Sequence, residues 1–153
     1  MCMKLILNGD PRWTDRHLEF IKRYIRSYGG SIDESWYDSE SHKILNGNPS
    51  SRCESNQLCY GIYDEDDYLG DLIIDDENEI DITIFDEFSG KNYAYKAIDI
   101  FIKEIYKELE DLEAVIRKEN PYKCKIQKIL KNVGFELKET SIEGNEIWVY
   151  TKL

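Results

Sequence analysis

The strongest constraint on the fold is a change of hydrophobic period midway along the chain. Residues 79–85 alternate, which predicts a strand with Ile80, Ile82 and Ile84 on one face and Asp81, Thr83 and Phe85 on the other. Further along, apolar residues recur at helical spacing, at Ala94, Ala97, Ile98, Phe101, Ile105 and Leu109. The apolar run 112–116 then predicts another strand. Because a helix joins these two strands, the sequence predicts a parallel crossover within a mixed sheet.

The remaining segments complete an α/β pattern. Further strands are predicted at residues 4–7, 58–63, 69–74, 135–138 and 146–152. A short helix is predicted at 39–45 and a longer one at 120–133. Thr14 or Asp15 is expected to cap a first helix that uses Leu18, Ile21, Tyr24 and Ile25 and ends at Gly29–Gly30. The expected fold class is α/β, with a mixed, splayed sheet of about six or seven strands flanked by helices.

The acidic composition narrows the function classes. Lys and Arg number 20 and Asp and Glu number 31, so the formal net charge is −11. This balance disfavours nucleic-acid binding, which needs a concentrated basic face. No apolar run approaches the roughly 20 residues that span a bilayer, and the first residues lack the apolar core of a signal peptide. We therefore expect a cytoplasmic protein with neither a membrane nor a nucleic-acid partner.

Metal and disulfide chemistry are not expected. The residues concerned are four cysteines and two histidines, Cys2, Cys53, Cys59, Cys124, His17 and His42. The cysteines form no Cys-x-x-Cys pair, and the histidines stand at no recognisable zinc-ligand spacing. The expectation is reduced, partly buried thiols and no bound metal.

The loop before the central helix is a candidate anion site. It contains Gly90 and leads into a helix N-terminus, where the first backbone N–H groups lack partners and the helix dipole is positive. Lys91 and Lys96 can add positive charge. The same spacing also fits an ordinary turn, so the flanking sequence has to decide between a turn and an anion site.

Residues 80–97 and three flanking segments resemble a known family. The run reads IDITIFDEFSGKNYAYKA. It resembles the central motif of the GNAT superfamily of acetyl-CoA-dependent N-acetyltransferases, and most closely the branch that acetylates ribosomal-protein N-termini. Tyr68–Leu72, Val115–Pro121 and Lys131–Phe135 are similar to the family's preceding strand, its asparagine-ended strand and the end of its next helix. The resemblance covers residues 58–153, whereas residues 1–57 match in the order of elements alone.

The resemblance implies one domain over residues 1–153, with 1–57 as a variable substrate-side part and 58–153 as a core that binds acetyl-CoA as co-substrate. The family's phosphate-loop signature, Q/R-x-x-G-x-G/A, falls on Ser89, Asn92 and Ala94, of which Ala94 obeys it. Asn92 replaces a glycine, and asparagine is the residue with a side chain that best tolerates positive φ. The implied cofactor-binding residues are Ile82, Thr83, Ile84, Phe85, Ser89, Gly90, Lys91, Asn92, Tyr93, Ala94 and Asn120.

Acetyl transfer needs a base for the amine and benefits from an acid for the departing thiolate. The resemblance places the reacting thioester beside Asp81, which makes this carboxylate the expected base, with Glu79 and Asp71 as alternatives. The family often places an acidic tyrosine where this chain has Leu130, and Tyr122 is the nearest hydroxyl in sequence. Solvated carboxylates and a packed aromatic side chain are the competing interpretations of these residues.

The expected acceptor is a primary amine of a small molecule or a peptide, and the acidic surplus favours cationic amines. Trp13, Trp36 and Tyr37 lie in the variable part, where a substrate wall is expected. The rival hypothesis is a non-catalytic GNAT-like module that binds a ligand or a partner protein. It is favoured by the weak phosphate signature and by the missing tyrosine. The expected oligomeric state is a monomer or a homodimer.

Overall fold

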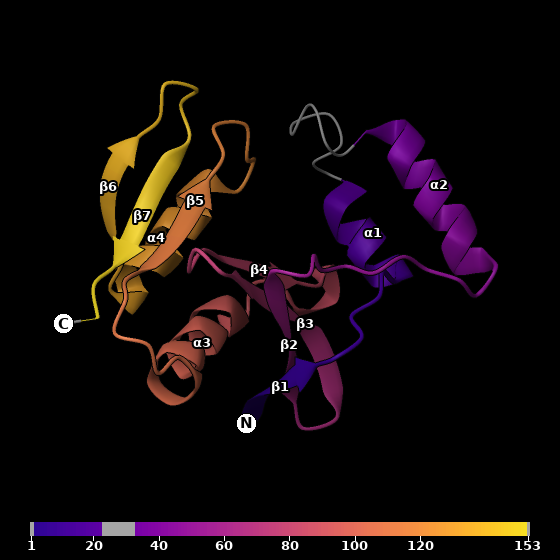
Figure 1. Ribbon diagram of the computed structural model, residues 1–153, viewed down its shortest axis with the longest axis horizontal. Helices are drawn as coiled ribbons and strands as arrows, with labels where there is room; N and C mark the ends of the chain where they lie inside the picture. Colours follow the sequence, from indigo (N-terminus) through magenta and orange to yellow (C-terminus); the bar gives the residue numbers. More distant parts are fainter. Residues whose placement is uncertain (1, 23–32, 153) are drawn as a thin grey trace.

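The computed structural model describes residues 2–22 and 33–152 (Figure 1). The predictions for Tyr24, Ile25 and Gly29–Gly30 lie outside these residues. The described strands are β1 (Met3–Asn8), β2 (Gln57–Asp64), β3 (Asp67–Asp75), β4 (Ile80–Ile84), β5 (Leu112–Ile116), β6 (Glu136–Thr140) and β7 (Glu146–Tyr150). The described helices are α1 (Asp15–Ile21), α2 (Glu34–Leu45), α3 (Tyr93–Ile100) and α4 (Lys123–Val133), with the 3₁₀ turn η2 (Asp86–Phe88) and the π-helical turn η3 (Phe101–Ile105).

The described strands form two antiparallel sheets that diverge from each other. The first sheet has the order β1-β2-β3-β4 and the second β5-β7-β6. Among the described residues, β4 and β5 meet at one parallel bridge, between Glu79 and Glu113, where Glu113 N–H donates to the Asn78 carbonyl at 2.9 Å. Beyond this point the two strands separate, as Figure 1 shows. The splayed α/β architecture is therefore confirmed. The predicted parallel pairing of these two strands is limited to this bridge.

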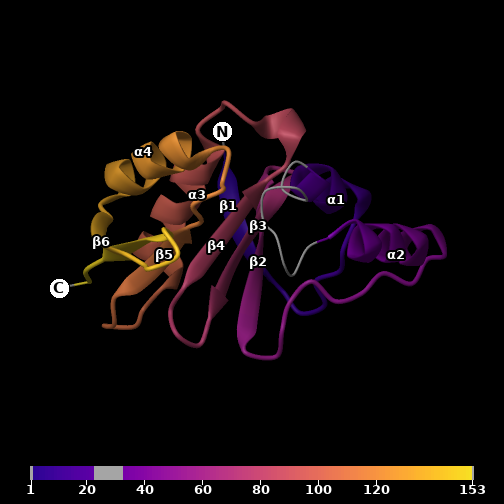
Figure 2. The ribbon, with the colours of Figure 1, turned by 90° about the horizontal axis from the view of Figure 1, so that it is seen from above.

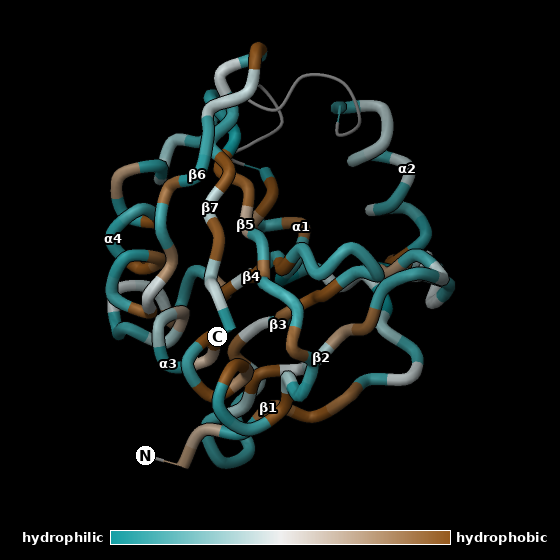
Figure 3. Tube along the Cα trace, turned by 60° about the vertical axis from the view of Figure 1, so that its left-hand side comes forward, coloured by the Kyte–Doolittle hydropathy of each residue, from teal (hydrophilic) through white to brown (hydrophobic). Residues whose placement is uncertain are grey.

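Helices cover opposite faces of the first sheet. Helices α3 and α4 pack against each other, and their apolar side chains join those of both sheets in the main core, as with Ile98, Phe101 and Leu130. Helix α1 lies against β4 and α2, and its Leu18 and Ile21 form a smaller apolar cluster (Figure 2). The residues of α2 are mostly hydrophilic, whereas β2 and β3 contain hydrophobic stretches (Figure 3). The smaller cluster therefore lies on the other face of the sheet from the main core.

Local hydrogen bonds explain where three helices begin and end. Asp33 caps α2 by accepting from Trp36 N–H at 2.8 Å, so α2 begins five residues earlier than the predicted Ser39. The helical turns after Tyr93 end at Ile105, because the Tyr106 backbone is extended. Leu109, predicted to continue that helix, is instead an exposed loop residue. The predicted cap of α4 was also wrong, because Asn120 accepts from Tyr122 N–H in a turn before the helix starts at Lys123.

Candidate active site

A groove of about 1170 Å³ occupies the space where β4 and β5 separate. It is lined by β4, β5, the loop before α3, the start of α4 and the segment around Trp13 and Arg52. Ligand pockets commonly measure about 300–1,000 Å³, so the groove has room for a large ligand or for two ligands side by side. The predicted site residues that line it are Glu79, Asp81, Ile82, Thr83, Ile84, Ser89, Gly90, Asn92, Tyr93, Ala94, Asn120 and Tyr122.

The β4 backbone presents an open sheet edge to this groove. Phe85 N–H donates to the Leu69 carbonyl and Asp75 N–H to the Glu79 carbonyl, so hydrogen-bonded pairs with β3 fall on residues 79, 81, 83 and 85. Because antiparallel pairs alternate, the N–H and C=O groups of Ile82 and Ile84 point away from β3. An extended ligand with amide groups can pair with them as an added strand would.

Two carboxylates, Asp81 and Glu79, lie at this edge. The Asp81 side chain is accessible from the groove. Desolvation by the surrounding protein nevertheless raises its pKa, and this effect outweighs the lowering by the charges of Arg52 and Arg117. Burial also raises the pKa of Glu79, and the nearby Asp75 and Asp81 carboxylates raise it further. Both groups therefore bind protons more strongly than an ordinary carboxyl, which suits a base for an amine.

The polar face of β4 connects to a buried network that sequence reasoning missed. His17, Tyr68 and Arg52 all bond to Asp71, which is 1% exposed. The tautomer of His17 follows from its partners. Its Nδ1 accepts from Thr14 N–H at 3.1 Å, so its Nε2 carries the proton and donates to Asp71 at 2.5 Å. His17 is thus neutral, and burial lowers its pKa although Asp71 acts in the opposite direction.

The same network argues against Asp71, one of the alternative bases. Burial alone would raise its pKa, but the hydrogen bond from His17, the charge of Arg52 and the hydroxyl of Tyr68 together lower it. Asp71 does not line the groove, and both of its oxygens already accept hydrogen bonds. The sequence offered no signal for this cluster, because its members are 54 residues apart at the His17–Asp71 contact.

The loop before α3 has the shape of an anion cradle. Gly90 has φ 77° and Asn92 has φ 64° with ψ 21°, so Asn92 adopts the left-handed conformation that the phosphate-loop interpretation requires. The N–H groups of Gly90, Lys91, Asn92 and Tyr93 donate to no other residue within the described ranges. These groups stand at the first turn of α3, where the helix dipole favours an anion.

Helix α4 and the N-terminal segment supply the opposite wall. Asn120 and Tyr122 border the groove, and Tyr122 also packs on the smaller apolar cluster around Leu18 and Ile21. The Asn120 side-chain oxygen is used by Tyr122 N–H, which leaves its NH₂ group to donate to a ligand. Groove residues that the sequence interpretation did not name as ligand-binding include Phe20, Arg52, Arg117, Lys125 and Lys128.

Two of the predicted cofactor-binding residues lie away from the groove lining. The Phe85 side chain is buried against the His17 ring, with 4.9 Å between centroids, because it shares the β4 face of Asp81 and Thr83. Lys91 is exposed and does not border the groove. Trp36 and Tyr37, expected with Trp13 in a substrate wall, do not border the groove. They pack on the smaller apolar cluster, where the Trp36 ring centroid lies 4.9 Å from that of Trp13.

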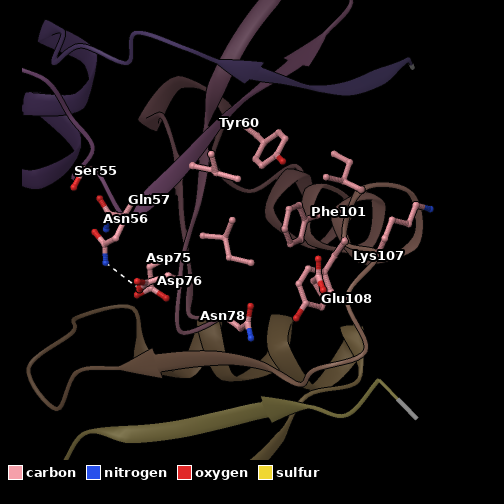
Figure 4. A pocket seen from close by; sticks show the side chains of 14 residues that line it. Ser55, Asn56, Gln57, Tyr60, Asp75, Asp76, Asn78, Phe101, Lys107 and Glu108 are labelled. Carbon is pink, nitrogen blue, oxygen red and sulfur yellow. Dashed lines mark hydrogen bonds between the residues drawn. The ribbon is translucent and has the colours of Figure 1, made fainter.

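A second, smaller cavity of about 500 Å³ lies between η3 and strands β2 and β3 (Figure 4). Its floor is aromatic, with Tyr60 and Phe101, and its rim carries Asp75, Asp76 and Glu108. The side chain of Asn56 donates to Asp76 at 3.1 Å across this rim. None of the predicted site residues borders it, so the groove between β4 and β5 is the candidate active site.

The described residues contain neither a cluster of metal ligands nor a helix suited to a membrane. No three His, Cys, Asp or Glu side chains within residues 2–22 and 33–152 come together as ligands for a metal ion. No helix in that part of the chain is both long and apolar enough to cross a membrane.

Solved structures with the same architecture include several acetyltransferases. The N-acetyltransferase PseH of Campylobacter jejuni, solved with acetyl coenzyme A, is 13% identical, with a TM-score of 0.60 over 99% of this chain and 100% of that one. The spermidine N-acetyltransferase of Vibrio cholerae, solved with CoA and spermine, is 15% identical, with a TM-score of 0.59 over 96% of this chain and 92% of that one.

An acetyltransferase from Thermus thermophilus is 13% identical, with a TM-score of 0.60 over 98% of this chain and 97% of that one. The chain matches no family model, and no curated protein sequence matches it. At identities this low, the structural likeness establishes the fold alone. The chemistry has to be argued from the groove of this chain. The fold of the chain is that of the GNAT N-acetyltransferases.

Proposed function

We propose that the protein is an N-acetyltransferase that moves the acetyl group of acetyl-CoA to a primary amine of a small molecule or peptide. The observation that carries this proposal is the groove, which joins an open β4 edge, an anion cradle and two carboxylates with raised pKa. Neighbours of the same fold were solved with acetyl coenzyme A or with CoA and spermine, which supports the same ligand class for this chain.

The residues of the groove fit the parts of acetyl-CoA. The unpaired N–H groups from Gly90 to Tyr93 suit its pyrophosphate, and the Ile82 and Ile84 backbone groups suit the amides of its pantetheine arm. Asn120 also borders the groove, and its NH₂ group is the proposed further donor to this arm. Acetyl-CoA brings a thioester, whose carbonyl carbon is open to attack by an amine. The chain itself binds, orients and moves protons.

Asp81 is the proposed base. The substrate ammonium must lose a proton before its nitrogen bonds to the acetyl carbon, and Asp81 takes this proton directly or through water. As the carbon–sulfur bond breaks, the thiolate is protonated, and the Tyr122 hydroxyl is the proposed donor. Both side chains border the groove, from opposite walls. Placement of the two substrates in one groove supplies a further part of the rate.

A titration and an amine panel test the proposal together. Calorimetry should show acetyl-CoA binding, and a thiol reagent should report CoA release with at least one of a set of peptides, amino acids, polyamines and aminoglycosides. A ribosomal-protein N-terminal peptide belongs in the panel, because residues 80–97 resemble that branch most closely. Binding without release for every amine would support the rival, a ligand-binding module. Absence of binding at millimolar acetyl-CoA would refute the cofactor assignment.

A further inference from the structure

We propose that Arg52 binds a carboxylate of the acceptor, so that the acceptor is a zwitterion of the amino-acid class with its amine at Asp81. This inference rests on the proposed acetyl transfer and adds an acceptor class to it. It begins from a charged side chain that borders the groove although it is only 9% exposed.

Arg52 is held rigidly by three partners. Its Nε donates to Asp71 at 3.0 Å, one of its terminal nitrogens donates to the Thr83 hydroxyl at 3.1 Å, and its guanidinium lies 4.9 Å from the Trp13 ring centroid. Its backbone is also fixed, because Arg52 N–H donates to the Pro11 carbonyl at 2.8 Å. A guanidinium fixed in this way is preorganised to bind a further group without loss of side-chain freedom.

One end of this guanidinium remains open. The terminal nitrogen Nη1 of Arg52 donates to no group within residues 2–22 and 33–152. In the same residues, no buried polar side-chain atom lacks a partner, and the Arg52 side chain is 9% exposed. The groove is the solvent space that Arg52 borders. Arg52 therefore offers a charged hydrogen-bond donor to whatever fills the groove beside Thr83, and carboxylates are, with phosphates, the oxygen groups with which guanidinium forms strong charge-assisted hydrogen bonds.

The neighbouring charges suit a molecule with both signs. Arg52 and Asp81 are close enough that the charge of Arg52 lowers the pKa of that carboxyl, and both border the same groove. An ammonium beside Asp81 and a carboxylate beside Arg52 would satisfy both at once. A polyamine would bring positive charge alone to this pair, and Arg52 would repel it.

The cost of burial also favours a ligand-binding role for this arginine. Removing a guanidinium and a carboxylate from water is expensive, and well-packed apolar residues often stabilise a fold as much as a buried ion pair does. The apolar side chains that border the same groove, Trp13, Phe20, Ile21 and Phe88, show that apolar packing is available here. They also provide a surface for the side chain of an amino acid.

Matched acceptors test this inference. Each of the twenty L-amino acids is compared with its primary amide and, where one exists, with the amine that lacks the carboxyl group. Polyamines are assayed alongside. The expected result is that kcat/KM for the best amino acid exceeds that for its amide and its carboxyl-free amine by about tenfold or more. Polyamines or carboxyl-free amines that match or exceed the amino acids would overturn the inference and leave acetyl transfer intact. No CoA release with any amine would refute both.

Variants of Arg52 separate binding from structure. Arg52→Lys and Arg52→Gln should lower kcat/KM for the amino acid about 10- to 100-fold, mainly through KM. The loss for the carboxyl-free amine should be clearly smaller, and smallest in Arg52→Lys, which keeps the positive charge that lowers the pKa of Asp81. Lys103→Gln, which removes an exposed cation on η3, is the matched control. An equal loss for both acceptors would show that Arg52 is structural. If Arg52→Gln does not fold, the double variant Arg52→Met/Asp71→Asn removes both buried charges, and its selectivity ratio decides.

Discussion

At the scale of single residues, the face of β4 that carries Asp81, Thr83 and Phe85 contains both accessible and buried side chains. Asp81 faces the groove, Thr83 binds Arg52, and Phe85 packs on His17. Alternation in the sequence predicts that these three residues share a face. It does not predict their different fates, because these depend on Arg52 and His17, which reach β4 from segments far away in sequence.

Replacement of Asp81 by asparagine should reduce turnover while acetyl-CoA binding persists. General base catalysis contributes about 10²–10⁴-fold, so kcat should fall within that range. Because the pKa of Asp81 is raised, kcat/KM of the wild type should climb with pH above the ordinary Asp range, and Asp81→Asn should lose this limb. Steady-state rates across pH measure both effects. Glu79→Gln is the control, and a larger loss there would assign the base to Glu79.

His17 predicts a pH dependence of stability. Its pKa is lower in the folded chain than the ordinary value of 6.5, so the unfolded state binds a proton first as pH falls. The stabilising contribution is therefore complete above about pH 6.5 and is lost below it. The wild-type melting temperature should fall between pH 7.5 and 5.5, and His17→Gln should fall less. His42→Gln, which alters an exposed histidine, should behave as the wild type. Equal slopes in His17→Gln and wild type would contradict the assignment.

At the scale of elements, the sequence predicted the strands of the core closely. It also predicted the ends of α2 and α4 and the Thr14 cap of α1, but not the starts of α2 and α4 or the end of the helical segment after Tyr93. The run 112–116 is β5 with the predicted bounds, and β4 follows the predicted alternation. Strands succeed because their side chains point alternately into and out of a core. The Leu109 error arose because helical spacing of apolar residues continues past Tyr106, where the backbone is already extended and the Tyr106 ring stacks on Phe101 with 5.9 Å between centroids.

The loop before α3 yields a prediction about a single torsion angle. Asn92 has φ 64°, which costs a β-branched residue about 1–3 kcal/mol. Asn92→Val should therefore weaken acetyl-CoA binding by about tenfold or more, whereas Asn92→Gly should bind as well as the wild type. Calorimetric titration of both variants checks the result. Undiminished affinity in Asn92→Val would place the pyrophosphate elsewhere.

Strand β4 predicts a pattern of hydrogen exchange. The Ile82 and Ile84 amides face the groove, whereas the Asp81 and Thr83 amides pair with β3. Acetyl-CoA should slow exchange at Ile82 and Ile84 and leave Asp81 and Thr83 nearly unchanged. Residue-resolved exchange by NMR measures this alternation. Uniform protection along β4 would indicate general stabilisation of the strand in place of direct pairing.

At the scale of the whole molecule, the groove separates two sheets that share one main core. A ligand that bonds to both walls should stabilise the entire fold. Acetyl-CoA at 100 times its Kd adds about 2.7 kcal/mol, which corresponds to a rise in Tm of about 5–10 °C for a chain of this size. Thermal unfolding with acetyl-CoA, ADP and pantetheine, all at the same concentration, measures it. A full shift with ADP alone would mean that the loop, and not both walls, supplies the stabilisation.

Each sheet is built from one continuous part of the sequence, which has a consequence for how the protein tolerates a break in its chain. All strands of the first sheet precede residue 85, and all strands of the second follow residue 111. The connecting residues 107–111 are exposed, and such positions are where chains best accept interruption. A break there would leave each fragment with a complete sheet, and the shared core would be the surface on which they reassemble. The groove would then form at the junction of two separate polypeptides, so that ligand binding reports their complementation.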